Sequence, residues 1–401
     1  MATVNLTPQP TPHRVPALDG VRGLAIVLVL VSHFRLGTTP TVADRVYEAV
    51  ALAGNSGVDL FFVLSGFLIT GILLDAKDAE RGAYFKNFYA RRALRILPLY
   101  YGVVASLALV WPLVHAPTAA WRLFHQNQWW YWLHATNILF AKTETLGMPY
   151  RTSHFWSLAV EEQFYLVWPI VVWYSSRRRL LHICVGCAVL ALVLRIALTP
   201  LDNFEWIYTL PVTRMDTLVA GAALAVLARG PGGLTPYRGV ATRVGGLAVA
   251  VWGALYVWSS LSPSAAPVFR TLGYSAIVVT YACLVTLALT TSWGGPMSAP
   301  ILRFFGKYSY GMYVFHFPLL FFMGPIYAVA AAVPLLGGSH LPSQLVFVVL
   351  ATALTSAVAF VSWHVYERHF LALKRYFPVA TPSPASSPIE AARETSSASV
   401  L

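Results

Sequence analysis

Residues 18–36 form the stretch LDGVRGLAIVLVLVSHFRL, an apolar run that is interrupted by Arg22 and His33. A helix of about twenty apolar residues is long enough to cross the hydrocarbon core of a bilayer. Further apolar stretches of this length recur along almost the whole chain, so we interpret residues 18–36 as a retained membrane helix and not as a signal peptide. The predicted spans are 18–36, 56–75, 93–114, 155–175, 180–199, 206–228, 240–261, 270–291, 307–335 and 343–366.

The composition supports an all-α integral membrane protein, a bundle of about ten transmembrane helices. Hydrophobic residues make up 57% of the chain and charged residues 11%, against about 25% charged residues in an ordinary soluble domain. The formal charge of +12 comes from Lys and Arg in short loops between apolar runs, with no single basic face. This pattern argues against nucleic-acid binding and indicates a protein whose main partner is the lipid bilayer.

The Lys and Arg residues also predict the orientation of the chain. They lie mostly in alternate loops, and the positive-inside rule then places both termini in the cytoplasm. We expect an N-terminal cytoplasmic tail at 1–16, a ten-helix membrane domain at 17–377 and a disordered tail at 378–401, which is rich in Pro, Ser and Ala. Residues 116–153 are expected to form a long loop whose Trp129–Trp132 cluster lies on the membrane surface.

The three cysteines are Cys184, Cys187 and Cys283, and the first two form a CxxC inside an apolar run. This spacing also occurs in redox pairs and in half of a zinc site. No second CxxC or Cys/His pair completes a metal set, so we expect small buried side chains and no metal.

Charged residues inside the predicted spans are the candidates for function, since each costs about 2.5 to 3.5 kcal/mol to insert. Arg22 and His33 are eleven residues apart, almost three helical turns, so they share one helix face. That face joins an anion-binding group to a titratable base about 16 Å further along the axis. The alternative for His33 is an interfacial histidine at a helix end.

Arg92 and Arg95, at i and i+3, share the cytoplasmic face at the entrance to the third span. Paired guanidinium groups suit phosphate oxygens, although such arginines also serve as positive-inside anchors. Pro98, just beyond them, is expected to kink the helix.

Glu161 and Glu162 begin the fourth span and point about 100° apart, so they have different roles. One of them orients a histidine or binds a hydroxyl, and the other pairs with an arginine. Pairs of these glutamates with Arg195 or Arg214, and of Asp216 with Arg214, remain open from the sequence.

Several motifs together resemble the acyltransferase 3 family of membrane acyltransferases, over about residues 17–375. The motifs are LDGVRG at 18–23 followed by His33, an arginine-x10-histidine pattern; GVDLFFVLSGFL at 57–68; Arg92-x-x-Arg95 leading to Pro98 and Tyr100; WSL at 156–158 running through Glu162 to Tyr165; and GKYSY at 306–310 leading to His316. The chain departs from the family pattern at Glu367, which is followed by Arg368 and His369 where relatives often have Glu-x-Pro, so no role is carried over to Glu367.

The resemblance implies a ten-helix bundle in the bacterial inner membrane that transfers an acyl group from cytoplasmic acyl-CoA to a hydroxyl. The acceptor would be a glycan, a lipid-linked sugar or a glycosylated small molecule, and acetyl is the expected acyl group. It also implies that His33 is catalytic and that arginines hold the CoA end. Many relatives carry a fused periplasmic hydrolase-like domain, and we expect a stand-alone form here.

The expected site follows from the motifs and the intramembrane charges together. His33 and Glu162 are the expected catalytic residues, Arg22, Arg92 and Arg95 bind acyl-CoA, and Asp59, Trp156, Glu161 and His316 bind the acceptor. Direct transfer in a ternary complex is preferred, with an acyl-histidine intermediate as the alternative. The rival function is a proton-coupled transporter of a polar or glycosylated compound, which would also use intramembrane Arg, Asp, Glu and His. The oligomeric state is not predicted.

Overall fold

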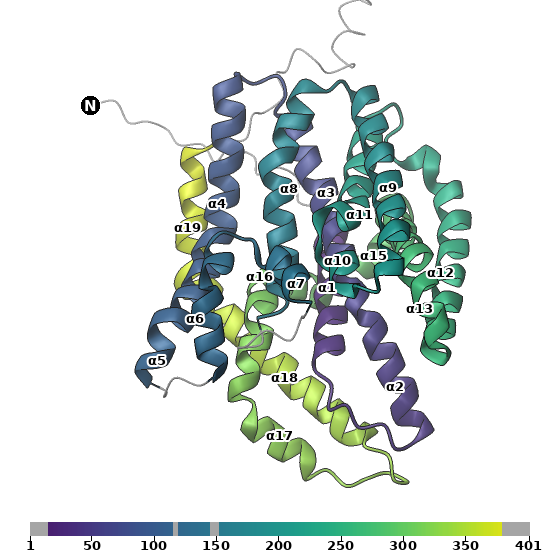
Figure 1. The fold of residues 1–401 in the computed structure, drawn as a ribbon. Coiled ribbons are helices and arrows are strands. Elements are labelled where there is room, and N and C mark those ends of the chain that lie inside the picture. The colour runs from purple at the N-terminus through teal and green to yellow at the C-terminus, as the bar shows by residue number, and fades with distance from the viewer. Residues whose placement is uncertain (1–14, 115–118, 145–151, 379–401) are drawn as a thin grey trace, which may run out of the picture.

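A computed structural model describes residues 15–114, 119–144 and 152–378. The described chain forms a bundle of helices with no β-sheet (Figure 1), which confirms the prediction of an all-α integral membrane fold. The long helices are α1 (Pro16–His33), α3 (Gly57–Asp75), α4 (Arg81–Ala105), α8 (Phe155–Tyr174), α9 (Arg177–Leu198), α11 (Pro211–Leu227), α12 (Arg238–Leu261), α14 (Tyr274–Thr290), α16 (Pro300–Leu319) and α18 (Leu341–Ser362).

Each predicted span corresponds to a helix or to a bent pair of helices. In the described part of the chain, eight helical segments are long and apolar enough to cross a membrane, and a ninth is formed if α16 and α17 (Gly324–Ala331) are one span. These two helices meet at a bend of 72°, so the predicted span 307–335 corresponds to a bent pair of helices. The remaining predicted span, 155–175, corresponds to α8. Its 20 residues include Glu161, Glu162 and Gln163, so this helix is less apolar than the other spans.

Two short helices occupy the segment predicted to be a long loop, and this prediction is wrong. They are α6 (Ala119–Trp132) and α7 (Thr136–Thr143), and their mixed polar and aromatic sequence lacks the long apolar run that marks a span. Trp129 is exposed, whereas the Tyr131 side chain is buried and its hydroxyl bonds to Thr152. A further helix that was not predicted, α2 (Val42–Ala53), begins with a capping box between Thr41 and Asp44.

Both predicted tails fall outside the described residues, except for their inner edges at residues 15–16 and 378. The predicted span 206–228 is divided into α10 (Phe204–Thr209) and α11. The break occurs at Leu210, which has extended backbone angles and precedes Pro211, because a residue before proline is disfavoured in the helical region.

The contact between α1 and α16 depends on glycines from both helices. A Cβ atom on Gly23 would lie 1.9 Å from the Leu302 carbonyl oxygen, and a Cβ on Gly306 would lie 1.8 Å from the Asp19 carbonyl oxygen. The two backbones are therefore in direct contact, as small residues permit in membrane helices. This crossing lies in the middle of the bundle (Figure 1) and sets the position of everything carried by the two helices.

Glycines on both helices also allow close contact between α3 and α11. A Cβ on Gly66 would lie 1.8 Å from the Leu218 carbonyl oxygen, and a Cβ on Gly221 would lie 1.9 Å from the Val63 carbonyl oxygen. Two helix pairs in the bundle are thus held at backbone contact by reciprocal glycines.

Buried ion pairs link α11 to its neighbours. Arg214 on α11 donates to Asp59 on α3 at 2.5 Å, and Arg195 on α9 pairs with Asp216 on α11 at 2.7 Å. Both arginine side chains are 1% exposed. Arg195 also donates to the Ser275 hydroxyl on α14, so one network connects four helices. The pairings that the sequence left open are therefore settled as Asp59 with Arg214 and Asp216 with Arg195.

We predict that Gly306→Ala destabilises the protein by about 1–3 kcal/mol or more, because a methyl group has no space between the two backbones. Unfolding of the purified protein in detergent, followed by heat or denaturant, measures the effect. Gly253→Ala on α12 is the matched control, since a Cβ there meets nothing within 4 Å. Equal stability of the two variants would contradict the close α1–α16 contact.

We also predict that Asp59→Asn lowers stability by about 3 kcal/mol, because Arg214 would keep a buried charge without its counter-charge. Asp75→Asn is the control. Asp75 pairs with Arg229 just after α11, so it joins the same two regions, but its side chain is 44% exposed. A change of at most about 1 kcal/mol is expected there, and equal losses in the two variants would refute the distinction.

Candidate functional site

A cavity of about 240 Å³ lies where α1 and α16 end and where α3 and α8 begin. Aromatic rings form much of its wall, with a few polar groups among them. The lining residues are His33, Arg35, Asn55, Val58, Ser153, His154, Trp156, Phe204, Tyr208, Tyr313 and Phe317. An apolar wall with a few convergent polar groups is the usual make-up of a small-molecule site.

His33 is the last residue of α1 and forms part of the cavity wall. Its Nδ1 atom lies 2.9 Å from Nε2 of His316 on α16, so the two predicted histidines are in hydrogen-bond contact. The ring also stacks on Phe317, with 4.4 Å between centroids. His33 is half-buried and faces both the cavity and the protein interior, as a positioned base requires.

The sequence analysis did not single out His154 or Tyr313 as site residues, and both line the cavity. His154 Nε2 lies 3.3 Å from the Val314 carbonyl oxygen, which has no helical donor four residues ahead because residue 318 is proline. The Tyr313 hydroxyl donates to the His154 carbonyl oxygen at 3.1 Å. The signal in the sequence that could have identified His154 as a site residue is its position just before the WSL motif at 156–158.

Trp156 is part of the cavity wall, and Asp59 lies behind the wall. Arg214 packs its guanidinium group against the rings of Trp156 and Tyr208, at 5.8 and 5.1 Å from their centroids. Asp59 holds Arg214 by the buried ion pair, so the carboxylate supports the cavity wall through Arg214.

Three arginines, Arg22 on α1 and Arg92 and Arg95 on α4, gather away from the cavity wall, close enough for their charges to interact. Arg22 pairs with Asp19 at 3.3 Å. Within the described residues, neither Arg92 nor Arg95 has a carboxylate oxygen within salt-bridge distance. A cluster of half-buried cations with incomplete neutralisation is suited to bind a polyanion. We call these three residues the inner arginines.

The two glutamates of α8 share Arg92 as a neighbour. Glu161 hydrogen-bonds to Ser65 and Tyr165 and interacts with Arg22 and Arg92. Glu162 lies near Arg92, and its Oε1 atom is buried with no hydrogen-bond partner among the described residues.

Neither glutamate contributes to the cavity wall, so the structure does not place Glu162 beside His33. Both glutamates belong to the half of α8 that faces the inner arginines.

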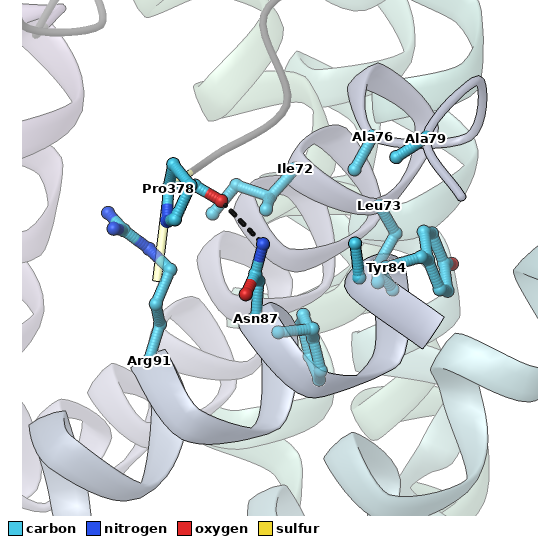
Figure 2. A pocket seen from close by; sticks show the side chains of 10 residues that line it. Ile72, Leu73, Ala76, Ala79, Tyr84, Asn87, Arg91 and Pro378 are labelled. Atoms are coloured by element: carbon cyan, nitrogen blue, oxygen red, sulfur yellow. Dashed lines mark hydrogen bonds between the residues drawn. The ribbon is translucent and has the colours of Figure 1, made fainter. Parts of the chain in front are cut away.

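Lys374, near the end of the described chain, adds a fourth cation to the inner arginines. Arg91 donates to the carbonyl oxygens of Lys374 and Phe377, at 3.2 and 2.9 Å, and Asn87 donates to the Pro378 carbonyl oxygen at 2.9 Å. Figure 2 shows the hydrogen bond between Asn87 and Pro378, which lies at a small cavity of about 30 Å³ between α4 and the segment that ends at Pro378. The segment brings the Lys374 ammonium group within electrostatic range of Arg92 and Arg95.

Glu367 is buried near Arg95 and accepts a hydrogen bond from Ser362 at 3.2 Å. Glu367 therefore lies in the region of the inner arginines although the residues that follow it, Arg368 and His369, depart from the family pattern. The three cysteines are free thiols, and Cys184 packs in the core. Over the ranges that the structure describes, no group of three or more His, Cys, Asp or Glu residues could hold a metal ion.

Comparison with known proteins places the chain among acyltransferases. The family model described as an acyltransferase domain matches residues 15–364, which include the cavity wall, the inner arginines and both glutamates. No solved structure matches the chain with significance.

Three curated relatives illustrate the similarity. A peptidoglycan O-acetyltransferase of Listeria monocytogenes is 27% identical over 331 residues, which cover 78% of this chain and 50% of the relative. A putative peptidoglycan O-acetyltransferase of Bacillus subtilis is 29% identical over 378 residues, covering 89% of this chain and 55% of the relative. A putative O-acetyltransferase of Staphylococcus aureus is 27% identical over 335 residues, with coverages of 78% and 52%. The chain thus spans about half the length of the curated relatives it matches.

The motifs quoted from the sequence, the helical bundle that carries them and the family match over residues 15–364 agree with one another. The chain is a multi-pass membrane protein and belongs to the acyltransferase 3 family.

Proposed function

We propose that this protein transfers an acetyl group from cytoplasmic acetyl-CoA to a hydroxyl of a carbohydrate-containing acceptor. The observation that carries the proposal is that His33 forms part of an aromatic cavity and lies on α1, the helix that also carries Arg22 of the inner arginines. The relatives described as peptidoglycan O-acetyltransferases support acetyl transfer to a glycan such as peptidoglycan. The loop charges support an orientation with both termini in the cytoplasm, and the family resemblance implies the bacterial inner membrane.

The donor would enter where the inner arginines and Lys374 gather. CoA carries several phosphate charges, and guanidinium groups bind phosphate oxygens in a bidentate manner. Arg92 and Arg95 have no carboxylate oxygen within salt-bridge distance in the described part of the chain, so their guanidinium groups are available to such a ligand. The pantetheine arm would then extend along α1 and α8 toward His33.

Polar side chains on α8 lie between the inner arginines and the cavity, where the donor would have to pass. Ser157, Glu161 and Tyr165 repeat every four residues and so share one helix face. Ser157 contacts Tyr313 at the cavity, and Glu161 interacts with Arg22 and Arg92. The inner arginines are not part of the cavity wall, so donor binding requires side chains of this stripe to move.

The chemistry joins an alcohol to a thioester. The free nitrogen of His33 takes the hydroxyl proton while the hydroxyl oxygen attacks the thioester carbonyl carbon. The carbon–sulfur bond then breaks, and the CoA thiolate takes the proton from the His33 imidazolium. Atoms and charge balance without any further reactant. The route through an acyl-histidine is the alternative, with the acetyl group on the same nitrogen before the alcohol attacks.

The acceptor would occupy the aromatic cavity. Trp156, Tyr208 and Phe204 supply aromatic wall surface against which the apolar side of a sugar can pack. Asn55, Ser153 and Arg35 supply hydrogen-bond groups around them. A volume of about 240 Å³ lies below the usual range for drug-sized ligands, so the cavity suits one sugar ring at a time.

We predict that His33→Ala lowers the rate of transfer by about 10²–10⁴-fold, the usual contribution of a general base. Purified protein would be given acetyl-CoA and glycan fragments, with release of free thiol and the mass of the acceptor as readouts. His182→Ala, on the exposed face of α9, is the matched control and should retain full activity. Undiminished transfer by His33→Ala would refute the role, and a transporter would release no thiol with any acceptor.

We further predict that Arg92→Ala and Arg95→Ala each raise KM for acetyl-CoA about tenfold or more, with little change in KM for the acceptor. This is the loss expected for a hydrogen bond to a charged group. Arg243→Ala is the control, because Arg243 is an exposed cation near the start of α12. If all three variants behaved alike, or if both KM values rose together, Arg92 and Arg95 would be only positive-inside anchors.

A further inference from the structure

We propose that His316 is a positioning residue that fixes the tautomer of His33 so that the His33 Nε2 lone pair is free to act as the base. The inference rests on the proposed function, because it assigns a task to the base of that reaction. It also gives His316 a role different from the acceptor binding expected from the sequence.

The direction of two hydrogen bonds carries the argument. His316 Nδ1 lies 2.6 Å from the Tyr313 carbonyl oxygen, and a carbonyl oxygen can only accept. His316 therefore carries its hydrogen on Nδ1, and its Nε2 atom has a lone pair. His33 Nδ1 lies 2.9 Å from that Nε2 atom, so His33 must donate from Nδ1. In a neutral imidazole the other nitrogen then has no hydrogen, and the His33 Nε2 atom is left as an acceptor.

The opposite assignment is electrostatically unfavourable. If His33 accepted at Nδ1, His316 would donate from Nε2, and a neutral His316 ring would turn its Nδ1 lone pair toward the Tyr313 carbonyl oxygen. Two lone pairs would then face each other across 2.6 Å. A donating His33 Nε2 would also present a hydrogen to the acceptor hydroxyl, where the reaction needs a lone pair.

His316 is placed to support His33 and not to touch the acceptor. It is fully buried and is absent from the wall of the cavity, whereas its neighbours Tyr313 and Phe317 are part of that wall. Phe317 stacks on the rings of both histidines, with centroid distances of 4.4 Å to His33 and 4.6 Å to His316. The packing leaves His316 one polar contact with a side chain, and that contact is His33.

The surrounding residues hold the His316 ring in place. The ring of His154 packs edge-on against it at 4.6 Å, and His154 is itself bonded to the Val314 carbonyl that Pro318 leaves free. Two consecutive carbonyls of α16, those of Tyr313 and Val314, thus orient two histidines. Fixed orientation matters because a base that turns away, or holds the wrong tautomer, loses most of its catalytic effect.

His316 also assists once the proton has moved. Protonation of His33 Nε2 produces an imidazolium, whose Nδ1–H is a stronger donor than that of the neutral ring. The His316 lone pair faces that hydrogen directly, so the hydrogen bond strengthens as charge develops. Removing the lone pair should therefore affect the chemical step more than binding of either substrate.

The first test compares His316→Phe with His316→Gln in the full-length membrane protein. Phe keeps a ring of similar size but provides no acceptor, and we expect kcat to fall about 100-fold while both KM values change less than threefold. Gln offers an amide oxygen to His33 Nδ1 and should recover at least a tenth of the wild-type kcat. His182→Phe, on an exposed face of α9, is the control and should not change kcat.

Each outcome decides between roles. Wild-type kcat in His316→Phe would overturn the proposal, and an equal loss in the Phe and Gln variants would show that the ring only fills space. The proposed function fails separately, if His33→Ala still transfers acetyl groups or if the wild-type protein transfers none.

A second test does not depend on how any His316 variant folds. Nitrogen-15 NMR of histidine-labelled wild-type protein, with His33 identified by its absence in His33→Gln, reports which ring nitrogen carries the hydrogen. The proposal predicts the Nδ1–H form for both His33 and His316 near neutral pH. Observation of the Nε2–H form of His33 would overturn it.

Discussion

The contact between α1 and α16 is the constraint on which the rest of the site depends. Gly23 and Gly306 allow the two backbones to touch, and no larger residue fits at either position. The helices then continue side by side to the point where His33 and His316 meet at 2.9 Å. Residues 283 positions apart in the chain are thus brought into one hydrogen bond by two residues that have no side chain. A catalytic geometry on membrane helices is built in this way from close packing, because lipid supplies little hydrophobic force between helices.

Charged groups in the bundle fall into two classes that differ in how they are neutralised. Asp59, Arg214, Arg195 and Asp216 pair with one another behind the cavity wall and hold α3, α9, α11 and α14 together. The inner arginines, joined by Lys374, form a cluster in which, among the described residues, only Arg22 has a carboxylate oxygen within salt-bridge distance. Paired charges suit a rigid support, whereas cations without a close counter-charge suit a polyanionic ligand, so we assign the first class to the scaffold and propose the second as the donor site.

The sequence predicted the membrane fold, because span length and intramembrane charge are visible in a single chain. Of the residues that form the cavity wall it singled out His33 and Trp156. It predicted a long loop at 116–153, where α6 and α7 lie, because short mixed-polarity helices carry no hydropathy signal. It placed Glu162 in catalysis with His33, whereas Glu162 lies near Arg92 and is not part of the cavity wall. His154 and Lys374 were missed because their roles arise from contacts between segments distant in the chain. Spacing along one helix predicts which residues share a face, but not which neighbour that face meets.

The central claim is that a donor held by the inner arginines reaches an imidazole in the cavity. A cryo-electron microscopy structure of the wild-type protein with a non-hydrolysable acetyl-CoA analogue tests it most directly. The account predicts phosphate density at Arg92 and Arg95 and the acyl carbonyl beside His33, with the Glu161–Tyr165 stripe displaced. Density for the analogue anywhere else, or an acyl group that remains far from His33 while the phosphates are bound, would contradict it.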